Sequence, residues 1–455
     1  MPDNHPTTLP DPVREEALRL AAAALPPGME AAQSLLRPLL AGIPLAELAA
    51  MAPDELAAMV VSLAGLAQQR LPGEARIRVL PAGRFPHPVA EIVTDDMPFL
   101  VDSVLAALAH HGRPLRQVLH PVLPATRAAD GSLQAMGEGP LRESLMRISF
   151  ASTDAATAQT EALIAATLAD IRVAVEDFAA MLAELRGAEA ELDGDPRAFL
   201  AWLAEDNFVL LGHRRIMIDG SGFRAEEGLG LLRDPAIPVF DALRDLSAVP
   251  EAARGGLLER LPITVAKANM RSTVHRTQHA DVIAVRIFAE DGSVLGIRLF
   301  LGLFAAAAYN RNPRSIPMLA AKVERVLQAS GVAPDSHDGR ALRNILDTWP
   351  RDELFQASEA EILHGARRAL DLALMPRTAM VLRPDPFGRF VSAIIWLPRE
   401  NFDTRLRSQV AELLARAHGG RLSAFYISLG DAPLARVHYI IGTDPMNPAR
   451  VDACL

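Results

Sequence analysis

The hydrophobic period of this sequence changes in the same order in two separate stretches, and this constrains the fold most. In residues 75–150, the alternating segments ARIRVL and VAEIVT precede the helically spaced DDMPFLVDSVLAALAHHG, and two more alternating segments follow. From Thr378 onward the order strand, helix, strand, strand recurs. Period-two alternation indicates strands, and apolar residues three and four apart indicate helices. The sequence therefore predicts an α+β fold with two ferredoxin-like β-α-β-β-α-β units, if an early strand pairs alongside the first.

The other regions differ in pattern. Residues 1–72 have helical spacing, and Pro53, Asp54 and Glu55 suit the first turn of a helix. Residues 193–331 predict mainly antiparallel sheet: a hairpin turning at DGSG, then four more strands with turns at QHAD and EDGS. Residues 332–377 predict a helical connector. The predicted domains are 1–72, 73–192, 193–331, 332–377 and 378–455, with DGDP (Asp193 to Pro196) as a linker.

Within the first predicted unit, the local signals are specific. Asp95 or Asp96 is expected to cap the helix, with Pro98 in its first turn and Gly112 after its end. The segments LRQVLHPVLPA and ESLMRISFAS predict two strands joined by a turn-rich segment. One long helical stretch, Asp154 to Leu192, closes the unit.

The second predicted unit stops after its third strand, without a final helix and strand. This leaves a sheet face and an edge open, which folded domains avoid, so we expect the chain to be the front part of a longer protein. The expected consequence is that the strand residues at the C-terminal end leave apolar surface or a strand edge partly open. These residues are Phe425, Ile427, Val437, Tyr439 and Ile441.

Charge and cysteine content exclude several classes of protein. The net charge of -9 argues against a broad nucleic-acid surface, which needs clustered basic residues. The single cysteine, Cys454, allows neither a disulfide within the chain nor a cysteine-based metal site. The N-terminus lacks a secretory signal pattern, and the longest apolar run, LFLGLFAAAAY, is too short to span a bilayer. We expect a cytoplasmic protein that binds no membrane.

The segment SHDGRALRNILDTWPRDELFQ is the most polar candidate for a site. Ser336, His337 and Asp338 are adjacent, and adjacent side chains do not converge as a nucleophilic triad requires. As metal ligands they would need further partners, such as His364. A helix start capped by Asp338 is favoured, with Trp349 ending its helix before Pro350.

Other candidate motifs have simpler explanations. GSGFRA (Gly220 to Ala225) formally matches a dinucleotide fingerprint, but FRAEEGLGLL does not predict the helix that this fingerprint requires. Asp95, Asp96 and Asp102 could bind a cation, although capping and solvation are favoured. His110 and His111 suit the C-terminal end of a helix. No metal site is predicted.

Several stretches together resemble one family. These are DDMPFLVDSV, ESLMRISF, FLAWLAEDNFVLLGHRR, SHDGRALRNILDTWPRDELFQ and FGRFVSAIIWLPRENFDTRLR. Over residues 75–445 the chain resembles the N-terminal half of the large bacterial NAD-specific glutamate dehydrogenases. The resemblance implies a longer protein that oxidatively deaminates L-glutamate to 2-oxoglutarate and ammonia with NAD. It implies that the ferredoxin-like units are ACT-type modules, that the middle sheet is PAS-like, and that a Rossmann-fold dehydrogenase domain lies downstream.

The resemblance also sets expectations for individual residues. Glutamate dehydrogenases need lysines close to glycines, and neither of the two lysines here, Lys267 and Lys322, has a glycine neighbour. Catalytic and cofactor-binding residues are therefore expected outside this chain, which alone should be inactive. The expected partners are its own downstream catalytic domain, further copies in a homo-oligomer, and an amino-acid effector.

ACT modules often bind amino acids at the loop into their first helix, commonly at Pro-Gly. The corresponding candidate residues here are Asp95, Asp96, Pro98 and Phe99, and Phe99 stands where Gly would admit a ligand. PRENFD, the loop of the second unit, has no Pro-Gly either, so pairing of modules across subunits is favoured over effector binding. The expected structural connector residues are Asp338, Trp349, Arg351 and Phe355. The alternatives are a stand-alone ACT-type amino-acid-sensing protein and, more remotely, a hydrolase using His337.

Overall fold

The computed structural model describes residues 11–152, 157–219, 222–237, 261–385, 388–429 and 433–443. Cys454, the first ten residues and the turn residues Gly220 and Ser221 lie outside this described part. The chain divides into two compact units. The first comprises Met1–Glu176 and Ser272–Gln278, and the second comprises Asp177–Arg271 and His279–Leu455. Within the described residues, no helix combines the length and the apolar character needed to cross a membrane.

The first unit begins with the helices that the sequence predicts. They are α1 (Pro12–Ala23), α2 (Glu30–Ala41), α3 (Leu45–Ala50) and α4 (Pro53–Leu66). Pro53 occupies the first turn of α4, where its missing N–H costs no helical hydrogen bond. Apolar residues of these helices pack on one face of the following sheet, around Val89, Val93 and Leu145.

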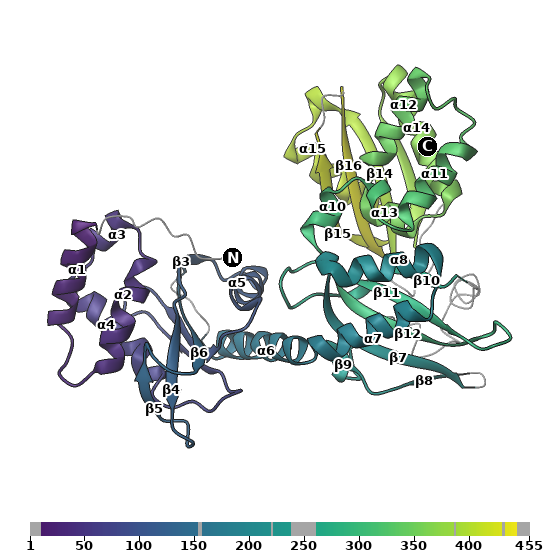
Figure 1. Cartoon of the computed structure of the whole chain (residues 1–455). Coiled ribbons are helices and arrows are strands. Elements are labelled where there is room, and N and C mark those ends of the chain that lie inside the picture. Colours follow the sequence, from purple (N-terminus) through teal and green to yellow (C-terminus); the bar gives the residue numbers. More distant parts are fainter. Residues whose placement is uncertain are drawn as a thin grey trace. The chain divides into compact units, whose positions relative to one another are not determined.

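A six-stranded antiparallel sheet follows. Its strands are β1 (Arg76–Leu80), β2 (Val89–Asp95), β3 (Leu115–Leu119), β4 (Val122–Arg127), β5 (Leu133–Met136) and β6 (Leu141–Phe150). The order is β1-β2-β6-β4-β5, and β3 also pairs with β6. Strand β1 pairs with the outer side of β2, so it supplies the early strand that the ferredoxin-like interpretation requires. The helices α5 (Leu100–His110) and α6 (Thr157–Glu176), both labelled in Figure 1, contact each other. Helix α6 also contacts β1.

Two predictions for this region are wrong in detail. LRQVLHPVLPA forms two strands, β3 and β4, because Pro121 has no N–H to continue the ladder, and β5 lies within the predicted turn. The single helix predicted from Asp154 to Leu192 is broken at Asp177 (ψ -1°), and α7 (Phe178–Ala190) begins after it. The Asp177 carboxylate accepts hydrogen bonds from the Gly230 N–H and from Arg233, 2.6 Å each, within the second unit.

The second unit contains a mainly antiparallel sheet after α7. The preceding elements are α8 (Gly194–Trp202) and the π-helical turn η1 (Leu203–Asn207), so DGDP begins a helix instead of forming a linker. The strands are β7 (Phe208–Asp219), β8 (Gly222–Ala225), β9 (Leu229–Gly230), β10 (Ile263–Arg271), β11 (His279–Phe288) and β12 (Val294–Phe304), with the 3-10 turn η2 (Leu231–Arg233) after β9. The order is β10-β11-β12-β7-β8, and β9 pairs with β7.

The hairpin β7–β8 confirms the predicted turn position. The segment 262–305, predicted to form four strands, forms three, β10 to β12. His279 and Asp281, predicted in a turn, lie inside β11 and pair with neighbouring strands. The turn predicted at EDGS does separate β11 from β12. The turn prediction at QHAD fails because His279 and Asp281 are paired in the sheet with partners from distant segments, which the local sequence pattern cannot reveal.

Helices connect this sheet to the next one, as the sequence predicts. They are α10 (Ala306–Asn310), the 3-10 turn η5 (Pro313–Ser315), α11 (Leu319–Ala329), α12 (His337–Asp347), α13 (Arg351–Gln356) and α14 (Glu359–Leu374). Gly331, with φ +68°, follows the end of α11. Ser358 and Glu361 form a capping box at the start of α14.

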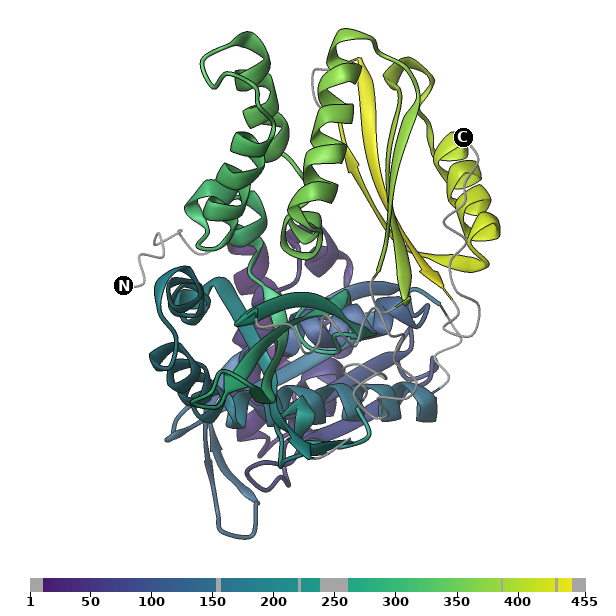
Figure 2. The ribbon, with the colours of Figure 1, turned by 90° about the vertical axis from the view of Figure 1, so that its right-hand side faces the viewer.

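The last sheet has the order β13-β14-β16-β15 and is antiparallel. Its elements are β13 (Ala379–Pro384), β14 (Phe390–Pro398), the 3-10 turn η6 (Arg399–Asn401), α15 (Thr404–Ala417), β15 (Gly420–Ser428) and β16 (Leu434–Thr443). One face packs against α14 through residues that include Ile394 and Trp396. The other face packs against α15 through Ile395 and Tyr439. Figure 2 shows the two helices on opposite faces of this sheet.

This packing corrects the expectation of an uncovered sheet. Val437, Tyr439 and Ile441 are fully buried, because β16 lies between β14 and β15 and α15 covers that face. Phe425 and Ile427 are exposed as expected, since β15 lies at the end of the described sheet. Strand β13 occupies the outer position next to β14, as β1 does next to β2 in the first unit.

Candidate functional site

The predicted effector loop lies between β2 and α5 in the first unit. Neither aspartate caps the helix: α5 begins after Phe99, which adopts a left-handed conformation with φ +70°. Asp95 ends β2, and its carboxylate accepts hydrogen bonds from Arg70 and Arg172, 2.8 Å each, and from the Gly73 N–H. Burial opposes ionisation of Asp95, but Arg70 and the other donors lower its pKa below the ordinary value.

The other loop residues are also engaged or exposed. Asp96 pairs with Arg142 at 3.3 Å, and Pro98 is exposed before the helix. The sequence signals placed the helix start too early, because Asp95 is bound by tertiary partners and only Phe99 has the backbone conformation that opens the helix.

Phe99 stands where the resemblance expects glycine, and its backbone has the conformation that favours glycine. Its ring lies 5.2 Å from that of His275, between centroids, in the segment Ser272–Gln278 of the same unit. The His275 N–H donates to Ser103 Oγ (2.8 Å), and the Ser103 hydroxyl donates to the Phe99 carbonyl (2.6 Å). Two aromatic side chains therefore contact each other beside this loop.

The polar segment from Ser336 to Gln356 forms α12, α13 and the turn between them. Ser336, not Asp338, caps α12: its Oγ accepts from the Gly339 N–H (2.9 Å) and donates to the Ala333 carbonyl. Asp338 lies in the first turn, where a carboxylate favours the helix dipole. The His337 side chain is 86% exposed, and its Nδ1 lies 3.5 Å from Asp338 Oδ1. The Ser336 hydroxyl is therefore part of a helix cap, and no triad geometry is formed.

Trp349, which precedes α13, and Phe355, within α13, contact different sheets of the second unit. Trp349 is buried, and its indole lies 6.2 Å from that of Trp396 in β14, between centroids. The Phe355 ring stacks on Phe304 of β12, with centroids 4.8 Å apart. Arg351 donates to the carbonyls of Trp349, Arg311 and Asp347. The connector thus contacts both sheets of the second unit.

Each of the two lysines of the chain contacts one end of α13. Lys267 on β10 places Nζ 2.6 Å from Asp281 and 3.2 Å from Asp352, which lies in the first turn of α13. Lys322 on α11 donates from Nζ to the carbonyls of Phe355 (3.3 Å) and Ala357 (2.5 Å), at the C-terminal end of α13. A cation is favourable at a helix C-terminus. The short helix is therefore held by one ammonium group at each end.

Burial and neighbouring charges shift the pKa values of several groups in this cluster. Burial by itself lowers the pKa of Lys267, but Asp281 and Asp352 raise it well above the ordinary value. Burial raises the pKa of Asp281 to about 6, opposed by Lys267. Burial lowers the pKa of Lys322 to about 8. Tyr309 completes the cluster, with its hydroxyl 3.3 Å from Lys267 Nζ and from Asp352 Oδ1.

Glu353, the residue after Asp352 in α13, forms a second buried ion pair. Glu353 binds Arg383 of β13 through two hydrogen bonds of 2.8 and 2.6 Å, a bidentate geometry. His438 Nε2 lies 3.7 Å from Glu353 and 2.8 Å from the Ser392 hydroxyl. Burial opposes ionisation of Glu353, but Arg383 lowers the pKa of its carboxyl.

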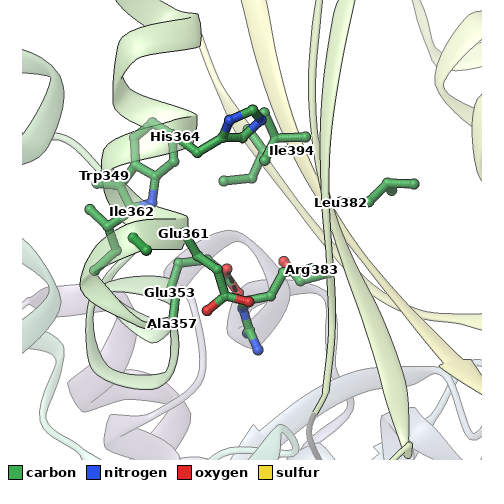
Figure 3. Close-up of a pocket in the computed structure, with 12 residues that line it drawn as sticks. Trp349, Glu353, Ala357, Glu361, Ile362, His364, Leu382, Arg383 and Ile394 are labelled. Atoms are coloured by element: carbon green, nitrogen blue, oxygen red, sulfur yellow. Dashed lines mark hydrogen bonds and ion pairs between the residues drawn. The ribbon is translucent and has the colours of Figure 1, made fainter. Parts of the chain in front are cut away.

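This ion pair forms part of the lining of a pocket of about 270 Å³ between α13, α14 and the β13–β14 hairpin (Figure 3). The buried part of the lining includes Trp349, Glu353, Arg383 and Ile394, while His364 on α14 is exposed. Within the described residues, no group of three or more His, Cys, Asp or Glu is placed to hold a metal ion. The predicted connector residue Trp349 thus belongs to the pocket, while Asp338, Arg351 and Phe355 lie outside its lining.

The sequence interpretation missed most of these residues, although a signal was present. Lys267, Asp281 and Arg383 are charged residues inside alternating apolar strands, and each is buried or nearly so. Charged side chains are rarely buried unless they are paired. Such positions can be flagged from sequence, but their partners come from distant segments and cannot be identified there.

The comparisons with known proteins agree with the order of these elements. Residues 35–166 match the family model described as glutamate dehydrogenase, ACT1 domain. Residues 316–374 match glutamate dehydrogenase, helical motif 1, and residues 379–454 match glutamate dehydrogenase, ACT2 domain. The first match includes α4 and the sheet of the first unit, the second includes α11 to α14, and the third begins at β13.

Curated relatives are similar over most of this chain. A protein named NAD-specific glutamate dehydrogenase from Halomonas elongata is 31% identical over 447 residues, which cover 90% of this chain and 27% of the relative. Proteins of the same name from Pseudomonas aeruginosa and Mycobacterium tuberculosis are each 29% identical, covering 80% and 83% of this chain. The chain thus spans about a quarter of the length of these relatives.

Proposed function

Because this chain belongs to the NAD-specific glutamate dehydrogenase family, we propose that it is the N-terminal regulatory and assembly portion of such an enzyme. The observation that carries the proposal is the ordered set of ACT1, helical motif 1 and ACT2 matches. The structure supports it with two antiparallel sheets of related strand order, separated along the chain by a further sheet and helices. The paired, buried charges around α13 suit a rigid joint.

The proposed reaction of the whole protein is L-glutamate with NAD and water giving 2-oxoglutarate, ammonia and NADH. The formal dinucleotide motif does not have the structure that NAD binding requires. Gly222–Ala225, which carry most of the formal dinucleotide motif, form strand β8 paired with β7, and no helix begins there. Lys267 and Lys322 are engaged in holding α13. We therefore place the catalytic and NAD-binding residues in the part of the protein beyond this chain.

The finer assignments are part of the same proposal. We assign the sheet β10-β11-β12-β7-β8 to a PAS-like domain; it is antiparallel throughout, and the first and last of its long strands, β7 and β12, pair directly. Domain limits at 72, 192, 331 and 377, homo-oligomerisation and a cytoplasmic location stay predictions. For the loop with Asp95, Asp96, Pro98 and Phe99 we propose a structural role, supported by its ion pairs and by the Phe99–His275 contact.

The experiment compares this chain with the product of the whole reading frame that contains it. Each purified protein is incubated with glutamate and NAD, and NADH is followed by its near-ultraviolet absorbance. We expect activity only from the longer product. NADH formed by this chain above a blank without glutamate would overturn the placement of the catalytic residues. A longer product without glutamate-dependent NADH formation would overturn the proposed enzyme.

The alternative is a stand-alone ACT-type amino-acid-sensing protein. It predicts a reading frame that stops after Leu455 and a stable product of this length. The sequence of the reading frame and the size of the protein isolated from cells distinguish the two. A Lys-containing glycine-rich motif and a Rossmann fingerprint downstream support the dehydrogenase.

A further inference from the structure

Strand β15 has a bulge that directs one residue toward the sheet containing β10 and β11. Its pairing register with β16 shifts between Leu422 and Ala424, so Ser423 is the extra residue of the bulge. The Ser423 carbonyl accepts a hydrogen bond from Arg271 Nη2 (2.8 Å), and the Ser423 hydroxyl lies 2.8 Å from His279 Nε2. A bulge re-aims the residues of a strand, and here it gives two sheets of the second unit a polar contact.

The two partners of Ser423 are themselves neighbours. Arg271 and His279 lie opposite each other in the pairing of β10 with β11. His279 Nδ1 lies 3.3 Å from the Ala268 carbonyl, so in the neutral ring the proton is on Nδ1 and Nε2 accepts from the Ser423 hydroxyl. Ser423 is thus held through both its carbonyl and its hydroxyl, and the second of these contacts requires a neutral imidazole.

The charges around His279 oppose protonation of its ring. Burial lowers the pKa of His279, and the neighbouring guanidinium of Arg271 adds to this effect. Lys267 on β10 and Arg421 on β15 act in the same direction, while the hydrogen bond to the Ala268 carbonyl opposes them. Because the folded state prefers the neutral ring, its stabilising contribution is present above the ordinary histidine pKa and is lost as the pH falls below that value.

The carboxylates of this charged cluster are already paired. Asp281 on β11 and Asp352 on α13 bind Lys267, at 2.6 and 3.2 Å. A protonated His279 carries a hydrogen on Nε2, so the Ser423 hydroxyl can no longer donate to that atom. Acid therefore removes the present hydrogen bond and adds a positive charge beside three cations.

We propose that Ser423, His279 and Arg271 form a latch that holds β15 against β11 at neutral pH and releases it in mild acid. The helical connector also contacts both sheets, through Trp349 and Phe355, so opening the latch frees β15 without separating the sheets. Strand β15 is the outer strand of its sheet, so the latch makes this edge sensitive to protons. The latch is a property of this chain and does not depend on the proposed reaction.

The test is hydrogen exchange of the full 455-residue chain, measured by mass spectrometry and corrected for the intrinsic pH dependence of amide exchange. Between about pH 7.5 and about pH 5.5, a range that includes the ordinary histidine pKa, we expect the protection of Gly420–Ser428 to fall. The inner strand β14 should keep its protection. Loss of protection in β14 together with β15 would show general unfolding in acid and would overturn the proposal.

Two histidine variants isolate the titrating group. His279→Gln keeps an oxygen that accepts from the Ser423 hydroxyl but gains no proton, so β15 should stay protected across the whole pH range. His337→Gln, at an exposed histidine of the same unit, is the matched control and should behave as the wild type. Equal loss of β15 protection in acid for the wild type and His279→Gln, or no loss in the wild type, would refute the latch.

A third variant tests the contact itself. Ser423→Ala removes the hydroxyl, and should lower the protection of β15 about fivefold at neutral pH, with little further loss in acid. Circular dichroism of each variant checks that the chain is folded. Unchanged protection of β15 in folded Ser423→Ala would show that the bulge does not hold the strand.

Discussion

His213 is a buried residue of β7 whose charge state should make the second unit sensitive to acid. Its Nδ1 lies 3.0 Å from the Leu299 carbonyl, and its Nε2 lies 3.5 Å from Glu184. Burial lowers the pKa of His213 to about 4, helped by Arg215 and Arg298 and opposed by Glu184. The folded state therefore prefers the neutral ring, and stability is lost as pH falls from the unfolded pKa toward the folded one.

We expect the free energy of unfolding to fall by about 2 kcal/mol from this residue between about pH 7 and about pH 5. His213→Asn keeps a donor for the carbonyl and should remove this part of the pH dependence, as measured by thermal melting at several pH values. His337→Asn, at an exposed histidine, should leave the dependence unchanged. If His213→Asn shows the same pH dependence of stability as the wild type, the dependence does not arise from His213.

Lys267 is the cation shared by the buried Asp281 and the partly buried Asp352, and its removal should be costly. Lys267→Met leaves Asp281 and Asp352 without their ammonium partner, which costs about 3–5 kcal/mol for a broken buried pair. Without Lys267 the pKa of Asp281 rises further, so the variant should regain stability as the pH falls and this carboxyl takes up a proton.

The other lysine provides the matched control for this prediction. Lys322→Met leaves only the carbonyls at the end of α13 unpaired, so a smaller loss without recovery in acid is expected. Thermal melting of both variants from neutral to mildly acidic pH tests the difference. Equal pH profiles of the two variants would contradict a charge effect specific to Lys267.

At the scale of elements, α14 packs so closely against Trp349 that glycine is required at one position. A Cβ on Gly365 would lie 2.8 Å from Trp349 Cζ2, and the indole is buried against β14. Gly365→Ala should therefore destabilise by about 1–3 kcal/mol through overpacking. Gly187→Ala, at an open position of α7, should stabilise by about 1 kcal/mol through helix propensity. Urea unfolding monitored by circular dichroism should show opposite shifts; shifts of the same sign would refute the close contact.

At the scale of the whole molecule, the outer strand β15 is the part of the described surface most suited to self-association. Phe425, Tyr426, Ile427 and Leu429 are exposed apolar residues on or next to it, and no described strand pairs with its outer side. We expect the chain to associate with increasing concentration, and Ile427→Lys to reduce this in sedimentation velocity. Leu413→Lys, at an exposed leucine of α15, should not. If Ile427→Lys and Leu413→Lys reduced association equally, pairing through the edge of β15 would be contradicted.

Much of the secondary structure follows from the sequence because its signals are local. The position of α4 follows from Pro53 and the acidic residues after it, and the β7–β8 hairpin follows from its turn. The repeated order of strand, helix, strand, strand predicted two related sheets, and both are present. The family resemblance also depends on ordered local segments, so the amino-acid sequence alone is enough to reveal it.

Only the tertiary structure decided which predicted polar residues act together. Asp95 has a suitable position to cap α5, yet Arg70 and Arg172 bind it from distant segments, and Phe99 opens the helix instead. Glu353 and Arg383 meet although thirty residues separate them. Sequence spacing specifies neighbours along one element, whereas the desolvation of a charge is offset only by a partner that the packed fold brings close. For the same physical reason, the pocket beside α13 became visible only when the helices were packed on the sheet.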